Sequence, residues 1–174
     1  MTKDNIVQLG SELLRQQAEP ITDFASPQFK QLLTDMQQLM EEANGVGIAA
    51  PQIGVSRQAL IIASRPTSRY PHAPLMAATV ICNPRFEVID ATRIKDWEGC
   101  LSVPGIRALV PRYRVITVSY QDANGSPCQL TLEDFPARVF QHEFDHLQGL
   151  VYLDRVENNA DIIAESEYFK RLAG

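Results

Sequence analysis

Two histidines four residues apart, with a glutamate beside the first, are the side chains of this sequence best suited to chemistry. They form the motif H-E-x-x-H, which consists of His142, Glu143 and His146. On an α-helix four residues advance about 400°, so both rings lie on one face and can share one metal ion. Glu143 lies about 100° around the helix from His142, where it can reach a metal-bound water without binding the metal. The spacing predicts a metal site with an acid/base group beside it.

An alternative for this motif is a surface helix whose two histidines are solvated, because short motifs also arise by chance. The neighbouring residues argue against this alternative. Phe140, Phe144 and Leu147 recur at helical spacing roughly opposite the histidines. Val139 falls beside the histidine face, where it could form a wall of a substrate pocket or simply pack in the core. Apolar residues on both sides predict a buried, central helix.

A catalytic site of this kind has three protein ligands and one open position, so a third ligand is required. No histidine follows His146, and Glu165 or Glu167 near the C-terminus would serve in a zinc endopeptidase. Upstream, Cys100 follows Gly99, which permits an unusual backbone. A thiolate with two imidazoles suits zinc, iron(II), nickel or cobalt. A structural metal site in a binding module is a further alternative, but it usually has four protein ligands, and no fourth is obvious near the cysteine.

A glycine-rich segment, G-V-G-I-A-A-P-Q-I-G, runs from Gly45 to Gly54. Its first six residues match the G-x-G-x-x-A form of the dinucleotide-binding fingerprint, which must follow a strand and open a helix. Here the segment follows an expected helix and meets Pro51, so we reject dinucleotide binding. What remains is a backbone that permits close approach. Its one polar side chain is Gln52, whose ordinary role would be to cap a loop.

Composition and charge restrict the class of protein. The 174 residues carry a formal net charge of -5, which argues against broad nucleic-acid binding, and we expect one domain over 1–174. No apolar run is long enough to cross a membrane, and Met1 to Asn5 lacks a signal-peptide pattern, which together favour a cytoplasmic protein. An odd number of cysteines without an export signal predicts reduced thiols. The cysteines are Cys82, Cys100 and Cys128.

Periodicity and turn signals predict an α+β fold, with antiparallel β-sheets packed around the central metal-binding helix and with N- and C-terminal helices. The expected helices are a lead-in over 6–18, a helix from Ser26 as N-cap to Asn44–Gly45, the motif helix from Asp134 as N-cap to Gly149, and a last helix over 161–172. The expected strands are 58–63, 79–89, 106–110, 114–121 and 127–132, the last two joined by a hairpin at 122–125. The proline-rich stretch 64–77 is expected to be an irregular loop.

Three segments together resemble the motifs of the peptide deformylase family. They are G-V-G-I-A-A-P-Q over 45–52, E-G-C-L-S over 98–102 and H-E-F-D-H over 142–146. Their order and approximate spacing also match, and the resemblance extends from Ser26 through Val156. It implies an enzyme that removes the N-formyl group from the N-terminal formylmethionine of new polypeptides and releases formate. It also implies iron(II) as the metal, which zinc, nickel or cobalt can replace.

The resemblance assigns roles to individual residues. Glu143 would be the general base and acid for a metal-bound water that attacks the formyl carbon. The side-chain amide of Gln52 and the backbone N–H of Leu101 would stabilise the oxyanion that forms. The metal ligands would be Cys100, His142 and His146.

Substrate contacts and partners follow from the same resemblance. The peptide backbone would pair near Val46–Gly47–Ile48 and Gly105–Ile106–Arg107, and the other candidates for the substrate site are Glu98, Gly99 and Val139. Glu98 and Arg112 could form a buried pair that braces the cysteine loop, or Arg112 could be solvated. Contact with the ribosome is expected for the family. The loop 64–77, Arg138 and the short C-terminal tail depart from the family pattern, and the sequence assigns them no role.

Overall fold

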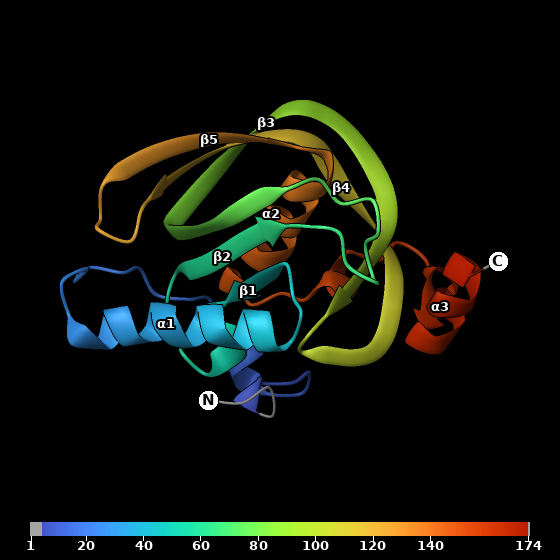
Figure 1. Ribbon diagram of the computed structural model, residues 1–174, viewed down its shortest axis with the longest axis horizontal. Helices are drawn as coiled ribbons and strands as arrows, with labels where there is room; N and C mark the ends of the chain where they lie inside the picture. The colour runs from blue at the N-terminus through green and yellow to red at the C-terminus, as the bar shows by residue number, and fades with distance from the viewer. Residues whose placement is uncertain (1–4, 174) are drawn as a thin grey trace.

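The computed structural model describes residues 5–173 and centres on a helix enclosed by a bent antiparallel sheet (Figure 1). The strands lie in the order β1-β2-β3-β4-β5, with β6 added to β4, and each of these pairs is antiparallel. The strands are β1 (Gly47–Ala49), β2 (Ala59–Ser64), β3 (Met76–Cys100), β4 (Val103–Gln121), β5 (Pro127–Glu133) and β6 (Ile162–Ala164). The α-helices are α1 (Pro27–Glu42), α2 (Asp134–Leu147) and α3 (Glu165–Ala173). The expected α+β class is confirmed.

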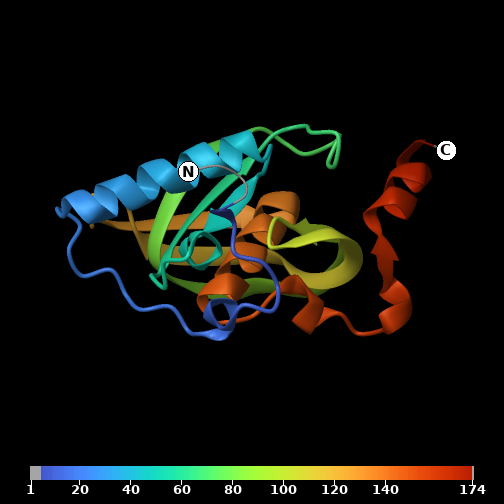
Figure 2. The same cartoon turned by 90° about the horizontal axis from the view of Figure 1, so that it is seen from below.

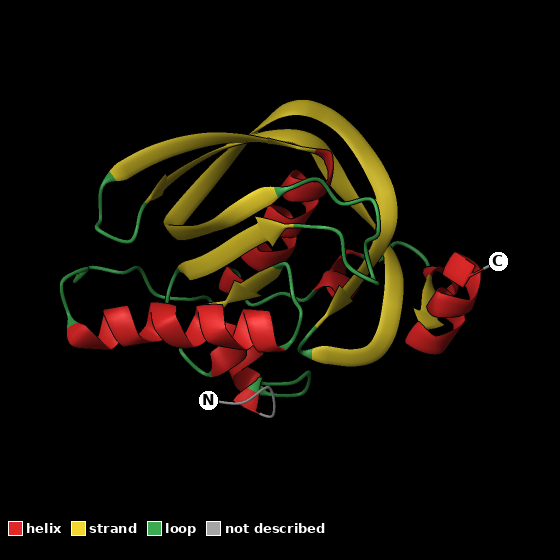
Figure 3. Cartoon of the chain, viewed as in Figure 1, coloured by secondary structure: helices red, strands yellow, loops and turns green. Residues whose placement is uncertain are grey.

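β3 and β4 are long strands that arch around α2 (Figures 1 and 3). Their pairing shifts register at four places, the first of them between Cys82 and Arg85. Asn83 has a φ of +49° there and precedes Pro84, so the regular ladder cannot continue. Each shift lets the strand bend. The accumulated bend carries the end of β3, and with it Cys100, back to the central helix.

β2 is buried on both faces, because α1 covers one side and α2 the other. Ala59, Ile61 and Ala63 pack in the cluster that contains α1, whereas Leu60 and Ile62 pack in the cluster that contains α2. The strand therefore reads as a continuous apolar run rather than an alternating one. The shorter β1 runs beside it and places the glycine-rich segment between the two helices. Figure 2 shows α1 lying across this part of the sheet.

The helix α2 is buried along most of its length, as the sequence predicts. Phe140 and Phe144 pack their rings against Phe86 of β3, at centroid distances of 5.7 and 5.2 Å. The expected start is wrong by one residue: Glu133 occupies the N-cap position, and no side-chain cap bond forms. Asp134 has a φ of +51°, so its backbone does not have the extended geometry of an N-cap.

Both ends of α1 and the C-terminal end of α2 are as expected. Ser26 caps α1 by accepting a hydrogen bond from the backbone N–H of Phe29, with Pro27 at the first helical position. Asn44 ends this helix with a φ of +50°. Gly149 follows α2 with a φ of +72°, in the left-handed conformation of a C-terminal cap.

Three expected elements differ in the structure. The lead-in over 6–18 contains only the 3-10 turn η2 (Glu12–Arg15). The expected strands 106–110 and 114–121 are one strand, β4. Pro111 lies in a part of β4 that pairs with β3 alone, because the pairing with β5 begins at Val115 and the pairing with β6 ends at Ala108. The other edge of β4 is therefore open at Pro111, so the missing N–H can face it.

The last helix also differs, because it begins four residues later than expected. Residues 159–161 form the 3-10 turn η5 (Asn159–Asp161), and β6 then pairs with Ile106 to Ala108 of β4. Only after this pairing does α3 begin. Long-range strand pairing has overridden the local helical pattern here.

The structure also bears on the expectation that the chain does not enter a membrane. Within residues 5–173, no helix combines the length and the apolar character that crossing a bilayer requires. Residues Met1 to Asp4, on which the expected absence of a signal peptide largely rests, lie outside the described residues.

Gly149→Ala is expected to lower the free energy of unfolding by about 2–4 kcal/mol. Alanine is strained at a φ of +72°, and its Cβ would lie 2.6 Å from the carbonyl oxygen of Arg15. Urea denaturation followed by circular dichroism measures the change. Gly10→Ala is the control, because Gly10 has a φ of +106° with no atom within 4 Å of the added Cβ. Equal losses at the two positions would rule out the overlap at Arg15.

Candidate metal centre

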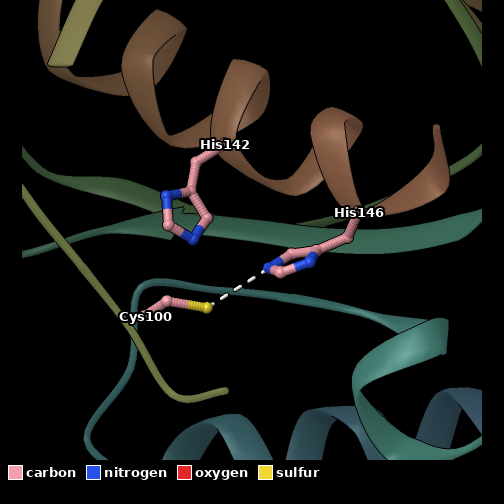
Figure 4. A group of neighbouring side chains, drawn as sticks. All are labelled: Cys100, His142 and His146. Atoms are coloured by element: carbon pink, nitrogen blue, oxygen red, sulfur yellow. Dashed lines mark hydrogen bonds between the residues drawn. The ribbon is translucent and has the colours of Figure 1, made fainter. Parts of the chain in front are cut away.

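Cys100, His142 and His146 meet inside the fold (Figure 4). Their ligand atoms all lie within 4.8 Å of one another, and Cys100 Sγ is 3.3 Å from His146 Nε2. Helix α2 supplies both rings, which are buried, and the end of β3 supplies the half-buried sulfur. Within residues 5–173 this is the one group of His, Cys, Asp or Glu side chains arranged to hold a metal ion.

The orientation of His142 is set by Glu98 and Tyr152. Nδ1 of His142 lies 2.9 Å from Oε2 of Glu98, and the imidazole stacks on the Tyr152 ring at 5.7 Å between centroids. The carboxylate can only accept, so Nδ1 donates and Nε2 is left as the ligand nitrogen. Burial would lower the pKa of His142, but hydrogen bonds to Cys100 and Glu98 outweigh it and raise the pKa well above its usual value. The surroundings therefore favour a positive charge at this point, and a metal ion bound at Nε2 would supply that charge in place of the proton.

His146 is the more deeply buried ring, with 0% of its surface exposed. Burial and the neighbouring charges of His142 and Arg112 lower the pKa of His146 well below its usual value. The ring is therefore neutral, and a neutral imidazole is the form that ligates a metal.

Glu98 is the carboxylate that organises the buried charges around the site. It accepts hydrogen bonds from Nε and Nη2 of Arg112 at 2.9 and 3.0 Å and from Nη1 of Arg138 at 2.8 Å, besides the bond from His142. Burial would raise the pKa of Glu98, but Arg112 and His142 outweigh it and hold the pKa well below its usual range. Glu98 therefore stays ionised. The Glu98–Arg112 pair is present and buried, so Arg112 is not solvated.

Asp145 holds the other side of Arg112. Its Oδ2 accepts from Nη1 of Arg112 at 2.6 Å, and its Oδ1 accepts from Nη2 of Arg155 at 2.7 Å. Asp145 is 2% exposed, so it belongs to the buried network rather than to the surface. No local pattern in the sequence identifies Arg155 as the partner of Asp145.

Arg138 has definite partners in the structure, although no local pattern in the sequence identifies them. It lies one turn before His142 on α2 and donates to the carbonyl oxygens of Ile94 at 2.6 Å and Val110 at 2.7 Å, besides Glu98. The side chain thus ties the helix that carries both histidines to the strand that ends in Cys100.

Glu143 lies in the same buried pocket and packs against Gly47. A Cβ at Gly47 would overlap the Glu143 carboxylate, so only glycine allows this approach. Burial raises the pKa of Glu143 to about 7, and Oε2 has no hydrogen-bond partner among the described residues. A carboxyl group with this pKa can both accept and return a proton near neutral pH.

Gln52 joins the glycine-rich segment to the cysteine loop. Its Oε1 accepts from the backbone N–H of Ala49 at 2.8 Å, which is the loop-capping role considered above. Its Nε2 lies 3.3 Å from Oγ of Ser102 and 3.5 Å from Sγ of Cys100. The amide nitrogen therefore points to Cys100, while the amide oxygen holds the backbone of the glycine-rich segment at Ala49.

A cavity of about 50 Å³ opens beside the cluster. The expected site residues that line it are Val46, Gly47, Gln52, Glu98, Gly99, Cys100, Leu101, Val139, His142 and Glu143. Six further lining residues were not expected as site residues, namely Asn44, Gly45, Arg69, Tyr70, Phe135 and Arg138. Phe135 could have been found, because 135, 139, 142 and 146 follow one helical face. Arg69 and Tyr70 lie in an irregular loop, where no periodicity marks a pocket residue.

Five expected site residues do not line this cavity: the candidate ligand His146, and Ile48, Gly105, Ile106 and Arg107. Ile48 is fully buried in the core, and Ile106 and Arg107 pair with β6. Arg107 lies directly behind Gly99, where a Cβ would overlap its guanidinium. Of the two segments expected to pair with the peptide, the one at Val46–Gly47 therefore lines the cavity and the one at Gly105–Arg107 does not.

The endopeptidase alternative required Glu165 or Glu167 as third ligand. Glu165 instead lies 3.5 Å from Nε of Arg107, and Glu167 pairs with Lys170 on the surface. Neither belongs to the cluster formed by Cys100 and the two histidines.

Comparison with known sequences gives a consistent result. The family described as Polypeptide deformylase matches residues 3–161. Peptide deformylase 2 of Nostoc sp. is 49% identical over 94% of this chain and 91% of its own length. Peptide deformylase 2 of Bordetella bronchiseptica is 44% identical over 88% of this chain and 87% of its own length.

Comparison with solved structures agrees. The Met-Ala-Ser-bound crystal structure of class I type b peptide deformylase from Acinetobacter baumannii has a TM-score of 0.84 and 39% identity, and the match covers 87% of this chain and 96% of that one. Peptide deformylase from Thermotoga maritima has a TM-score of 0.77 and 35% identity, over 88% and 97% of the two chains.

Cys100→Ser is expected to weaken metal binding by at least about 100-fold, since loss of an outer hydrogen-bond partner alone costs about 10–100-fold. Anaerobic equilibrium dialysis with Ni(II) or Co(II) measures the affinity. Cys128→Ser is the matched control, because Cys128 lies on β5 outside the cluster. Unchanged affinity in Cys100→Ser would exclude the sulfur as a ligand.

Proposed function

The chain belongs to the peptide deformylase family, and we propose that it removes the N-formyl group from nascent polypeptides with a divalent metal held by Cys100, His142 and His146. The observation that carries the proposal is the clustering of these three side chains beside a cavity that Glu143 and Gln52 line. Glu143 and Gln52 would be superfluous in a structural metal site, whereas both suit hydrolysis.

The three side chains suit a catalytic metal. One thiolate and two imidazoles are a donor set that zinc, iron(II), nickel and cobalt accept, and we expect iron(II) as the native ion. A metal bound there would act as a Lewis acid and would lower the pKa of a water ligand from about 16 toward about 7. Glu98 would support it by keeping the His142 tautomer that directs Nε2 inward.

Glu143 would handle the protons of the reaction. Its pKa of about 7 lets it take a proton from water and later deliver that proton to the leaving nitrogen. Delivery matters because an amine is a poor leaving group until it is protonated. The packing of Glu143 on Gly47 fixes the carboxylate close to the glycine-rich segment, where the formyl end of a substrate would lie.

Two groups of the chain would stabilise the negative oxygen of the tetrahedral intermediate. Gln52 offers Nε2, which lies next to the Cys100 sulfur, and Leu101 offers its backbone N–H from the turn after β3. One such donor typically accounts for about 10²–10³ in rate.

The methionine side chain would enter the cavity past Val139 and Phe135, which give it apolar walls. The peptide backbone would pair with the segment Val46–Gly47–Ile48. Among the described residues β1 pairs with β2 alone, so its other edge is free to accept a strand. We do not assign peptide pairing to Gly105–Ile106–Arg107, because β6 occupies that edge.

Nascent chains as substrates would place the protein in the cytoplasm and near the ribosome. The net charge of -5 lends no independent support to ribosome contact. Formate release from formyl-Met-Ala-Ser, measured with anaerobically prepared protein beside unformylated peptide, tests the activity. No release from metal-loaded protein would overturn the proposed function.

Glu143→Ala is expected to keep bound metal but to lower kcat for formate release by about 10²–10⁴-fold, because the proton acceptor is lost. Metal content and initial rates are measured on the same preparation. Glu41→Ala, on the exposed face of α1, is the control. Turnover near that of the parent protein would refute the role of Glu143.

The iron-loaded protein is expected to lose its activity in air, and the nickel-loaded protein to keep it. Cys100 is half-buried and lines the cavity, so oxidants can reach both the sulfur and the metal beside it. Activity is followed during aerobic storage, with mass spectrometry for oxidation of Cys100. Equal lifetimes in air for the two forms would contradict oxygen-sensitive iron at this site.

A further inference from the structure

The loop 65–75, here called the rim loop, supplies Arg69 and Tyr70 to the cavity. It joins β2 to β3 and contains Pro66, Pro71 and Pro74. Its backbone hydrogen bonds are few and local, chiefly those that link Thr67 with Tyr70. A loop with so little internal bonding depends on contacts from other segments to hold one conformation.

Arg69 bridges the rim loop to the end of α1. Its Nη2 donates to the carbonyl oxygens of Ala43 at 2.9 Å and Asn44 at 2.6 Å. Asn44 also lines the cavity, so this bridge spans the cavity wall. The backbone of Arg69 is held from the opposite side, where its carbonyl oxygen accepts a hydrogen bond from the Tyr168 hydroxyl of α3 at 2.9 Å.

Tyr70 is held by a buried cation. Nη1 of Arg107 donates to the Tyr70 hydroxyl at 3.0 Å, and Arg107 is only 1% exposed. The guanidinium carbon lies 5.6 Å from the Tyr70 ring and 5.2 Å from the Tyr168 ring. Glu165 of α3 faces Nε at 3.5 Å. One cation therefore lies between the rim loop, the C-terminal helix and Gly99 of the cysteine loop.

The C-terminal segment, defined as Ile162–Ala173, is held to the rest of the molecule by one strand pairing and a few side chains. β6 pairs with β4 beside Arg107, and in α3 only Tyr168 is buried. The Tyr168 ring also contacts Trp97 of β3 at 5.8 Å. A helix of nine residues is too short to be stable by itself, so these contacts keep it in place.

The same segment lies beyond residues 3–161, over which the family matches. In Figures 1 and 2 the loop after β2 and α3 lie on the same side of the molecule. Tyr168 and Glu165 therefore support the pocket from a segment that lies outside the matched region.

We propose that the C-terminal segment is a positioning element of the substrate pocket, which acts through Tyr168 and Arg107 to hold Arg69 and Tyr70 against the cavity. The inference rests on the proposed function for its kinetic consequence. Without the support, substrate would bind a less ordered rim loop and would have to order it on binding. The chemistry beside Cys100 would be unaffected once substrate is bound, so KM changes and kcat does not.

Tyr168→Phe tests this directly, because it removes the hydrogen bond to the Arg69 carbonyl and keeps the ring over Arg107. We expect KM for formyl-Met-Ala-Ser to rise about three- to tenfold, which corresponds to one hydrogen bond, with kcat within about twofold. Tyr168→Leu removes the ring as well and should raise KM further. Tyr120→Phe, near the β4–β5 hairpin, is the control for loss of a tyrosine hydroxyl.

Limited trypsin digestion provides a second measurement that needs no activity. Arg69 lies in the rim loop and is followed by Tyr70, whereas Arg65 precedes Pro66 and is not a trypsin site, so faster cleavage after Arg69 in Tyr168→Phe, at unchanged Tm, supports the proposal. Unchanged cleavage together with unchanged KM would overturn it, as would a fall in kcat and Tm without a change in KM. If the parent protein releases no formate, the proposed function fails, while the digestion still decides whether the segment holds the rim loop.

Discussion

A single buried carboxylate, Glu98, accepts hydrogen bonds from two arginines and a histidine, and the site depends on this arrangement. Burying a charge is costly unless other charges and donors compensate it, and here every donor comes from another part of the chain. Arg112 comes from β4, while Arg138 and His142 come from α2. Because Glu98 lies two residues before Cys100, the bonds that satisfy its charge also fix the sulfur relative to the histidine rings. The contacts that compensate the buried charge of Glu98 are therefore also the contacts that position Cys100 relative to the two histidines.

The sheet positions Cys100, which is not carried by the central helix. α2 places two candidate ligands through its own periodicity, but the third candidate comes from a strand that passes over the helix. The register shifts in β3 bend that strand until Cys100 meets α2. Gly47 then lets β1 approach Glu143 closely, and Gly99 leaves room for Arg107 behind the cysteine loop. At both positions glycine is required because another side chain occupies the space that a Cβ would take, and not because the backbone must be flexible.

The parts of the site that depend on residues close together in the chain are predictable from the sequence, and the parts that depend on distant contacts are not. His142, Glu143 and His146 follow from helical spacing, and the start of α1 follows from the Ser26 cap. Cys100 needed the family resemblance, because spacing alone left Glu165 and Glu167 open. The partners of Arg138 and Asp145 were beyond reach, since they lie on strands whose bend is a property of the whole sheet. The C-terminal segment was misjudged at Ile162 to Ala164, where pairing with β4 replaced a helical turn.

The position of Arg69 and Tyr70 at the cavity has a consequence for inhibitor design. A ligand confined to the interior meets chiefly the three motif segments, whose pattern this chain shares with its family. A ligand that extends to the rim meets two side chains from a segment without any motif, supported by a helix outside the matched region. A compound that extends to the rim would therefore gain contacts with Arg69 and Tyr70 that a compound confined to the interior does not make.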